Sequence, residues 1–77
     1  YTTKFVALCP VNDKPITYCL EIKLSHKILV EDLLEEVNKF TSAFHEDIAD
    51  ELFSQFGGKQ TLTANHFGVV IKTKRKL

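Results

Sequence analysis

An apolar stripe with helical spacing runs through the middle of the chain and constrains its fold more than any other feature. Its members recur every three or four residues, namely Val30, Leu33, Val37, Phe40, Phe44, Ile48 and Leu52. The spacing predicts one long helix over residues 30–56, or two consecutive helices with the second opened near Thr41 and Ser42, because serine is a good N-cap. Gly57 and Gly58 are expected to end the helical region, since glycine adopts a left-handed backbone without steric cost.

The residues on either side of this region alternate with the two-residue period of β-strands. Residues 4–9 are predicted to form a strand that ends at Pro10, with Phe5, Ala7 and Cys9 on one face. The most regular alternation follows, with Ile16, Tyr18, Leu20, Ile22 and Leu24 on one face. Residues 60–64 and 67–74 are predicted to form a second hairpin with a tight turn at Asn65 and His66. The expected fold is therefore α+β, a four-stranded antiparallel sheet with helix on one face.

Length and composition limit the class of protein. A chain of 77 residues is expected to be a single domain over residues 1–77, with a core so small that we predict an oligomer. Its hydrophobic content of 44% and charged content of 26% are typical of soluble globular proteins. The sequence has no apolar run long enough to span a membrane and no secretory signal, so we expect no membrane partner and a cytoplasmic location. In that compartment Cys9 and Cys19 are expected to be thiols, although neighbouring strands would also allow them to pair.

The formal net charge of zero conceals a segregation of charge along the chain. Acidic residues predominate in the helical region, whereas residues 59–76 contain lysines and one arginine but no acidic residue. The simplest interpretation is a solvated helix face and a charged edge strand that resists aggregation. Subunit contacts, or contacts with nucleic-acid phosphates, are the alternative interpretations.

Two short motifs carry a resemblance to a known family. Leu8-Cys9-Pro10 stands at the end of the first predicted strand, and Phe44-His45-Glu46-Asp47 stands within the helical region. With the order hairpin, helix, hairpin, they make the chain resemble the tunnelling fold, and within it the 7-cyano-7-deazaguanine nitrile reductase family of queuosine biosynthesis. The resemblance implies a homo-oligomer whose subunits join their sheet edges into a barrel. It also implies that a purine or pterin ring binds where two subunits meet.

The resemblance gives a role to each candidate site residue. Cys9 is similar to the nucleophile that attacks the nitrile to form a thioimide, and His45 to the group that positions the ring or transfers a proton. Glu46 is similar to the carboxylate that grips the ring edge. Cysteine suits this reaction because an ionised thiol is the best nucleophile for a nitrile carbon. The family has an aspartate seven residues after the cysteine, where this chain has Ile16, so Asp13 or water is expected to replace that acid.

The motifs leave the cofactor and the exact reaction open. Residues 28–40 do not reproduce the nicotinamide-cofactor motif of the family, and no glycine-rich phosphate loop occurs, so NADPH is not expected. Short archaeal relatives convert the same nitrile on transfer RNA into an amidine without NADPH, which makes tRNA-borne 7-deazaguanine a second expected partner. Pterin cyclohydrolase relatives would instead use Cys9, His45 and Glu46 as metal ligands. No regular ligand spacing supports a metal site.

Two hypotheses from different classes therefore remain. The first is a nitrile-processing enzyme that acts through Cys9, His45 and Glu46. The second is a non-catalytic tunnelling-fold protein that binds a purine, a pterin or a partner, and the isoleucine at position 16 favours it. A lone cysteine is usually a small buried hydrophobic residue. Cys19, His26 and His66 are predicted to be structural.

Overall fold

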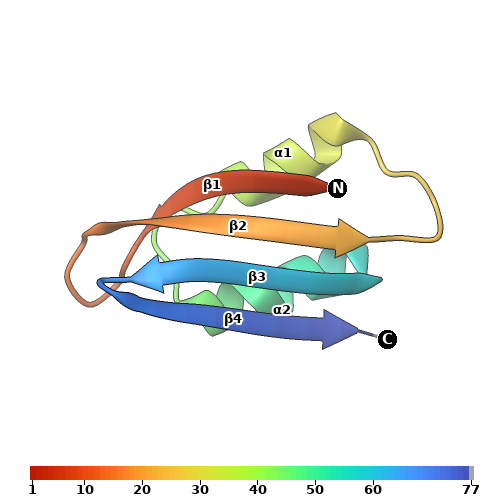
Figure 1. Cartoon of the computed structure of the whole chain (residues 1–77). Helices are drawn as coiled ribbons and strands as arrows, with labels where there is room; N and C mark the ends of the chain where they lie inside the picture. The colour runs from red at the N-terminus through yellow and green to blue at the C-terminus, as the bar shows by residue number, and fades with distance from the viewer. Residues whose placement is uncertain (77) are drawn as a thin grey trace.

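Four antiparallel strands and two helices make up the part of the chain that the computed structural model describes, residues 1–76. The elements are β1 (Thr2–Leu8), β2 (Pro15–Lys23), α1 (Val30–Asn38), α2 (His45–Phe56), β3 (Lys59–His66) and β4 (Val69–Lys76). The strands lie in the order β1-β2-β3-β4, so β1 and β4 are the two edges of an open sheet. Both helices cover the same face, α1 behind β1 and α2 behind β3 and β4 (Figure 1).

The alternation in β2 organises the core. Its inward side chains are at most 2% exposed, namely Ile16, Tyr18, Leu20 and Ile22. The apolar side chains of the neighbouring strands and of the helices pack against this row. Because successive side chains of a strand point to opposite faces, the register places Cys19, Glu21 and Lys23 on the outer face of the sheet.

The helical region contains two helices, and the interruption between them is fixed by β1. Leu8 and Ser42 form an isolated parallel bridge at the edge of β1. Ser42 is therefore not the N-cap that its residue type predicts. The second helix begins at His45 after Phe44, without a side-chain cap. Val30 and Phe44 also depart from the predicted stripe, because they are 54% and 52% exposed.

The turn of the second hairpin differs from the prediction. His66 pairs with Val69, so Phe67 and Gly68 form the turn instead of Asn65 and His66. Both turn residues have a positive φ, 56° at Phe67 and 99° at Gly68. This conformation is uncommon for a bulky residue, so residue type alone does not predict it at Phe67. Asn65 still helps to hold the turn, because its Oδ1 accepts a hydrogen bond of 2.7 Å from the Gly68 N–H.

The remaining strand limits shift slightly from their predicted positions. β1 begins two residues earlier than expected and ends before Cys9, and β3 and β4 extend to Lys59 and Lys76. The α+β class, the antiparallel four-stranded sheet and the pair of helices on one face are confirmed. Neither helix within residues 1–76 has the length and apolar content that crossing a bilayer demands.

The C-terminus of α2 is fixed to β3 by a side chain and a glycine. The buried Gln60 donates hydrogen bonds from Nε2 to the carbonyls of Leu52 and Gly57, at 3.0 and 2.8 Å. Gly58 follows with a φ of 72°. A Cβ at this position would lie 2.6 Å from the carbonyl oxygen of Lys23, which belongs to a neighbouring backbone. The connection from α2 to β3 therefore requires glycine for its conformation and for its close approach to β2.

Replacing Gly58 with alanine should destabilise the fold more than replacing Gly68. Both substitutions place a Cβ on a left-handed backbone, which costs about 1–2 kcal/mol. Only Gly58→Ala adds a clash with backbone, since a Cβ on Gly68 would meet nothing within 4 Å. Urea unfolding of the two variants checks this order, and an equal loss of unfolding free energy would contradict it.

Candidate functional site

A backbone junction brings the end of β1 to the start of α2. The Leu8 N–H donates to the carbonyl of Thr41 at 2.8 Å, and the Ala43 N–H donates to the carbonyl of Leu8 at 3.3 Å. Cys9 directly follows Leu8, and His45 lies two residues after Ala43. The structure therefore places the two residues predicted to act together at the same end of the molecule. Cys9 is a free, half-buried thiol that packs against the core.

His45 belongs to a cluster of three rings from three elements, Tyr18 of β2, His45 of α2 and His66 of β3, which we call the ring cluster. The centroid of the Tyr18 ring lies 5.5 Å from that of His45 and 6.1 Å from that of His66. Nδ1 of His45 and Nε2 of His66 are 3.3 Å apart, a hydrogen bond in which one nitrogen donates and the other accepts. His66, predicted to be structural, is thus a direct partner of His45.

Burial sets the protonation of the ring cluster. The pKa of His45 is lowered from its ordinary value, first because burial removes the ring from water and then because of the nearby His66. These effects outweigh the carboxylate of Glu46, which acts in the opposite direction. The pKa of Tyr18 is raised, first by burial and then by the negative charge that Cys9 carries when ionised. At neutral pH the cluster therefore holds a neutral imidazole and a protonated phenol, with the Cys9 thiol close enough to affect Tyr18.

Two buried polar atoms of the ring cluster make no hydrogen bond of good geometry with the described residues, although the Leu62 backbone lies near enough to the His45 ring to raise its pKa. They are the hydroxyl of Tyr18, whose residue is 0% exposed, and Nε2 of His45, whose residue is 6% exposed. Buried polar groups are almost always hydrogen-bonded, because an unpaired one costs about 1–3 kcal/mol. Such atoms beside a cysteine indicate a place where a ligand could supply the missing partners.

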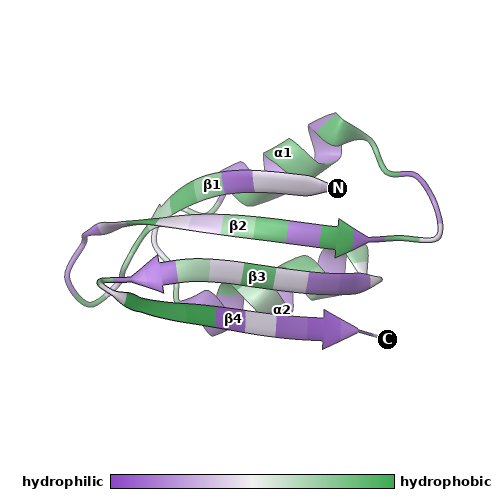
Figure 2. Ribbon diagram, viewed as in Figure 1, coloured by the Kyte–Doolittle hydropathy of each residue, from purple (hydrophilic) through white to green (hydrophobic). Residues whose placement is uncertain are grey.

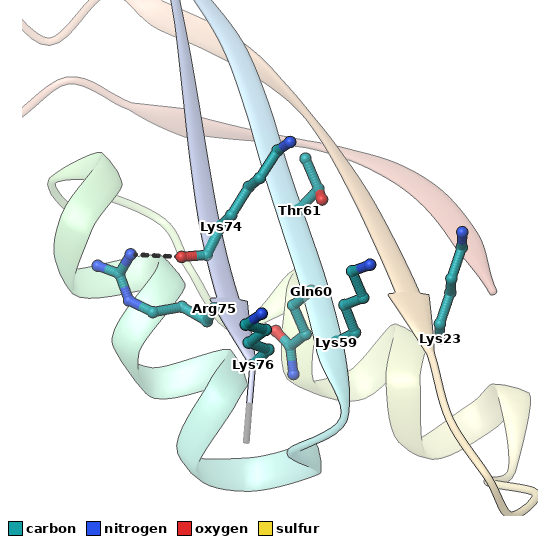
Figure 3. A pocket seen from close by; sticks show the side chains of 7 residues that line it. All are labelled: Lys23, Lys59, Gln60, Thr61, Lys74, Arg75 and Lys76. Carbon is teal, nitrogen blue, oxygen red and sulfur yellow. Dashed lines mark hydrogen bonds between the residues drawn. The ribbon is translucent and has the colours of Figure 1, made fainter.

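A hollow lies at the far end of the sheet from this cluster. Its volume is about 470 Å³, and it is lined by Lys23, Lys59, Gln60, Thr61, Lys74, Arg75 and Lys76 (Figure 3). Gln60 and Arg75 point toward the helices, and the others lie on the outer face of the sheet. The hollow is therefore separate from Cys9 and His45.

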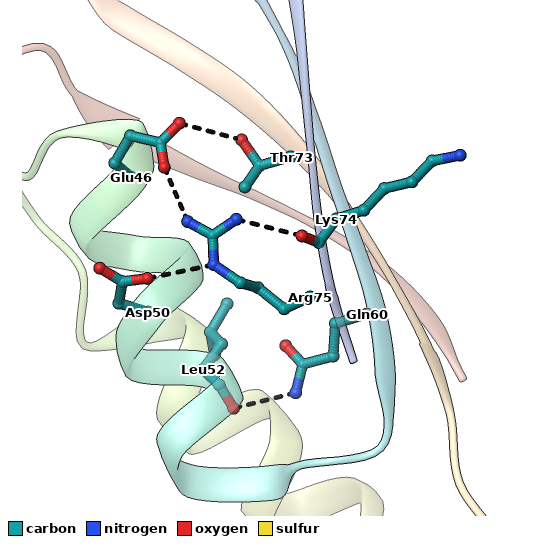
Figure 4. Close-up of polar contacts among 7 residues, drawn as sticks. All are labelled: Glu46, Asp50, Leu52, Gln60, Thr73, Lys74 and Arg75. Carbon is teal, nitrogen blue, oxygen red and sulfur yellow. Dashed lines mark hydrogen bonds and ion pairs between the residues drawn. The ribbon is translucent and has the colours of Figure 1, made fainter. Parts of the chain in front are cut away.

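Glu46 lies against β4 and not beside Cys9. Its Oε2 accepts a hydrogen bond of 2.7 Å from Arg75, and its Oε1 accepts one of 3.4 Å from the Thr73 hydroxyl (Figure 4). Arg75 also donates to Asp50, one turn further along α2, at 3.1 Å. The segregated charges of the sequence thus meet in part within the fold, through one arginine of β4 and two acids of α2. Glu46 nevertheless stays accessible, because its side chain is 65% exposed.

Asp13 and Ile16 lie in different surroundings within the first hairpin. Asp13 is exposed in the turn, where its φ is 57° and its N–H donates to the Cys9 carbonyl at 2.8 Å. Ile16 is 2% exposed in the core. The position at which the resembled family has an acid is therefore a buried apolar position in this chain.

No family model, curated protein or solved structure matches the chain. The assignment of a function therefore rests on the residues and their geometry. The sequence motifs predicted roles for Cys9, His45 and Glu46 but did not identify Tyr18, His66 and Arg75 as their neighbours. Within residues 1–76, no three His, Cys, Asp or Glu side chains converge as metal ligands would.

The lowered pKa of His45 should make the stability of the fold depend on pH. The folded state resists protonating this ring, whereas the unfolded chain protonates it near its ordinary pKa of 6.5. The stability that neutral His45 contributes is therefore present above this value and is lost as the pH falls toward the lower pKa of the folded state. Burial is the largest cause of this shift, followed by His66 and Glu46, with smaller contributions from the Leu62 backbone and Arg75.

Urea unfolding between about pH 7.5 and about pH 5.5 tests this pH dependence of stability. Histidine is the side chain that titrates in this range. The unfolding free energy of the natural chain should fall more steeply than that of His45→Gln. The exposed His26 provides the matched control, because His26→Gln should retain the natural slope. Equal slopes for the natural chain and His45→Gln would contradict the shift.

Proposed function

We propose that the protein is a tunnelling-fold relative that binds a 7-deazaguanine-type ring and captures its nitrile as a thioimide on Cys9. The observation that carries the proposal is the set of two unpartnered buried atoms, the Tyr18 hydroxyl and His45 Nε2, at the end of the sheet where Cys9 lies. A nitrile group suits both the unpartnered polar atoms and the nucleophilic thiol of Cys9. Its nitrogen accepts hydrogen bonds, and its carbon is electrophilic.

The proposed step is balanced without a cofactor. The sulfur of Cys9 bonds to the nitrile carbon, one π bond of the nitrile opens, and its nitrogen gains a proton. That proton comes in net from the thiol, so nothing is oxidised or reduced. In the tautomer whose hydrogen is on Nδ1, Nε2 of neutral His45 accepts this proton from the thiol and then passes it to the nitrile nitrogen. The protonated Tyr18 donates a hydrogen bond to the developing nitrogen anion. Whether the thioimide then receives an amine, as in the tRNA-modifying relatives, depends on the second substrate.

The positions of Cys9 and Glu46 favour a ring bound between two copies of the chain. Cys9 follows β1, and Glu46 lies against β4, so the nucleophile and the ring-gripping carboxylate are at opposite edges of the sheet. An open sheet has two edges that need partners. If β1 of one copy joins β4 of the next in a homo-oligomer, Cys9 and Glu46 meet at the seam. Asp13, exposed in the first hairpin, also reaches solvent near Cys9.

A thioimide on Cys9 should be visible by intact-mass spectrometry. Incubation with 7-cyano-7-deazaguanine, without NADPH, should add the mass of one ligand to the natural chain. The chain offers its own control, because both cysteines are free thiols, Cys19 on the outer face of the sheet and Cys9 packed against the core. Cys19→Ala should still form the adduct, and Cys9→Ala should not. An adduct that persists in Cys9→Ala, or none in the natural chain, would refute the capture.

A site shared between two copies of the chain can be tested by complementation. Cys9→Ala and Glu46→Gln should each form little adduct alone, because each removes one half of every site. Mixed after mild dissociation and reassembly, they should regain roughly a quarter of the natural yield if sites are shared between two copies at random. If Cys9 and Glu46 of each site belong to the same copy, the mixture should recover no adduct. That result would place the whole site within one subunit.

The burial of Ile16 favours a second candidate, a non-catalytic member of the same fold that binds the ring without reacting. An acid at this buried position would need a hydrogen-bond partner, and the core surrounds Ile16 with apolar side chains. The adduct experiment separates the two candidates when it is combined with calorimetry. Heat of binding without added mass supports the second, and neither heat nor mass overturns both.

A further inference from the structure

The outer face of the sheet, which no helix covers, is strongly cationic. The strand register places six lysines on it, Lys4, Lys23, Lys59, Lys72, Lys74 and Lys76. Glu21 is the one acidic side chain that the described strands present on this face. We call this set of lysines the lysine face. In Figure 2 the purple of hydrophilic residues predominates toward the C-terminal end of β4.

Three of these lysines stand directly opposite one another. Lys23 pairs with Lys59, and Lys59 pairs with Lys76, so one row across β2, β3 and β4 carries like charges only. Like charges at facing positions destabilise a sheet. Protection of an exposed edge explains the lysines of β4, but β2 and β3 are central strands that have no free edge. A role in binding an anion explains the whole row.

The 470 Å³ hollow supports this role, because the row of three lysines lines it together with Lys74 and Thr61. Arg75 also borders the hollow, but its guanidinium turns to the inner side and is neutralised by Glu46 and Asp50. The lysines of the outer face have no such ion pairs among the described residues. Their charge is therefore available to an external anion (Figure 3).

We propose that the lysine face binds the phosphodiester backbone of single-stranded nucleic acid. The charges extend from Lys4 on one edge strand to Lys72 on the other, which is more than one small anion can contact. Lys72, Lys74 and Lys76 occupy alternate residues of β4 and so lie about 7 Å apart. This separation is comparable to that of successive phosphates along an extended strand. The hydroxyls of Thr61 and Thr63 lie beside these lysines and are further phosphate donors.

Other anionic partners fit this surface less well. A membrane-binding face combines lysines with bulky apolar side chains that enter the lipid. Here the apolar outward residues Val6, Leu8 and Val70 gather instead near the hairpin turns. A protein partner would seat an apolar interface core, from which lysine is depleted. No aromatic side chain points outward from the described strands to stack on bases, so binding is expected to depend on phosphates and not on sequence.

Fluorescence anisotropy with labelled oligouridylate and oligothymidylate tests the proposal. Both should bind, with an affinity that falls as salt rises by a slope of about −0.7 per phosphate contact. Lys59→Gln should weaken binding several-fold and reduce that slope by about one contact. Lys27→Gln is the matched control, because Lys27 is exposed but lies outside the sheet, and it should bind as the natural chain does. Glu21→Gln removes the acid of this face and should tighten binding.

The two cysteines report which face is covered. Cys19 lies on the outer face between Lys4 and Thr63, whereas Cys9 lies on the side of the helices. Saturating oligouridylate should slow alkylation of Cys19 by iodoacetamide and leave that of Cys9 unchanged. An unchanged rate at Cys19, equal effects of Lys59→Gln and Lys27→Gln, or tighter binding of duplex, polyglutamate or anionic vesicles would overturn the proposal. None of these outcomes bears on the Cys9 adduct, so the two proposals fail separately.

Discussion

The inward row of β2 is the constraint on which the rest of the structure depends. Its four apolar side chains are at most 2% exposed and can be buried only if helices cover one face of the sheet. A shift of the register by one residue would turn this row to solvent, so the pairing of β2 with β1 and β3 is strongly specified. The same row includes Tyr18, which holds the ring cluster. The core and the candidate site are thus fixed by one strand.

Much of the fold could be predicted because it follows from local periodicity. The alternation from Ile16 to Ile22 and the helical spacing around Leu33 and Ile48 are properties of nearby residues, and all of these side chains are buried. The turn at Phe67 could not be predicted in this way, because a phenylalanine rarely adopts a positive φ. Local rules could not predict the start of α2 either. Ser42 pairs with Leu8 of β1 instead of capping the helix, and its neighbours Thr41 and Ala43 make the hydrogen bonds.

The candidate site shows the same division between local and distant information. Cys9 and His45 were predicted as site residues from short motifs, and the junction at Leu8 places them at one end of the molecule. The contact of His45 with His66 and the ion pair of Glu46 with Arg75 join residues that are far apart in the sequence. Periodicity assigns such residues to a face but not to a partner.

Both faces of the sheet also depart from ordinary stabilising rules, and such departures are where function is expected to lie. The inner face leaves polar atoms unpaired, and the outer face opposes like charges.

The pairing of β2 with β3 also has a consequence for the order in which the chain folds. The two hairpins close short loops and can form early, as can the two helices. Lys23, however, meets Lys59 only after the whole helical region between them has been closed into a loop. Non-local closure of this kind slows folding, because its entropy must be lost before the contacts form. The last step is therefore expected to be the docking of one hairpin on the other. The facing lysines repel each other where the two hairpins meet. An anion that binds there would speed the step as well as stabilise its product.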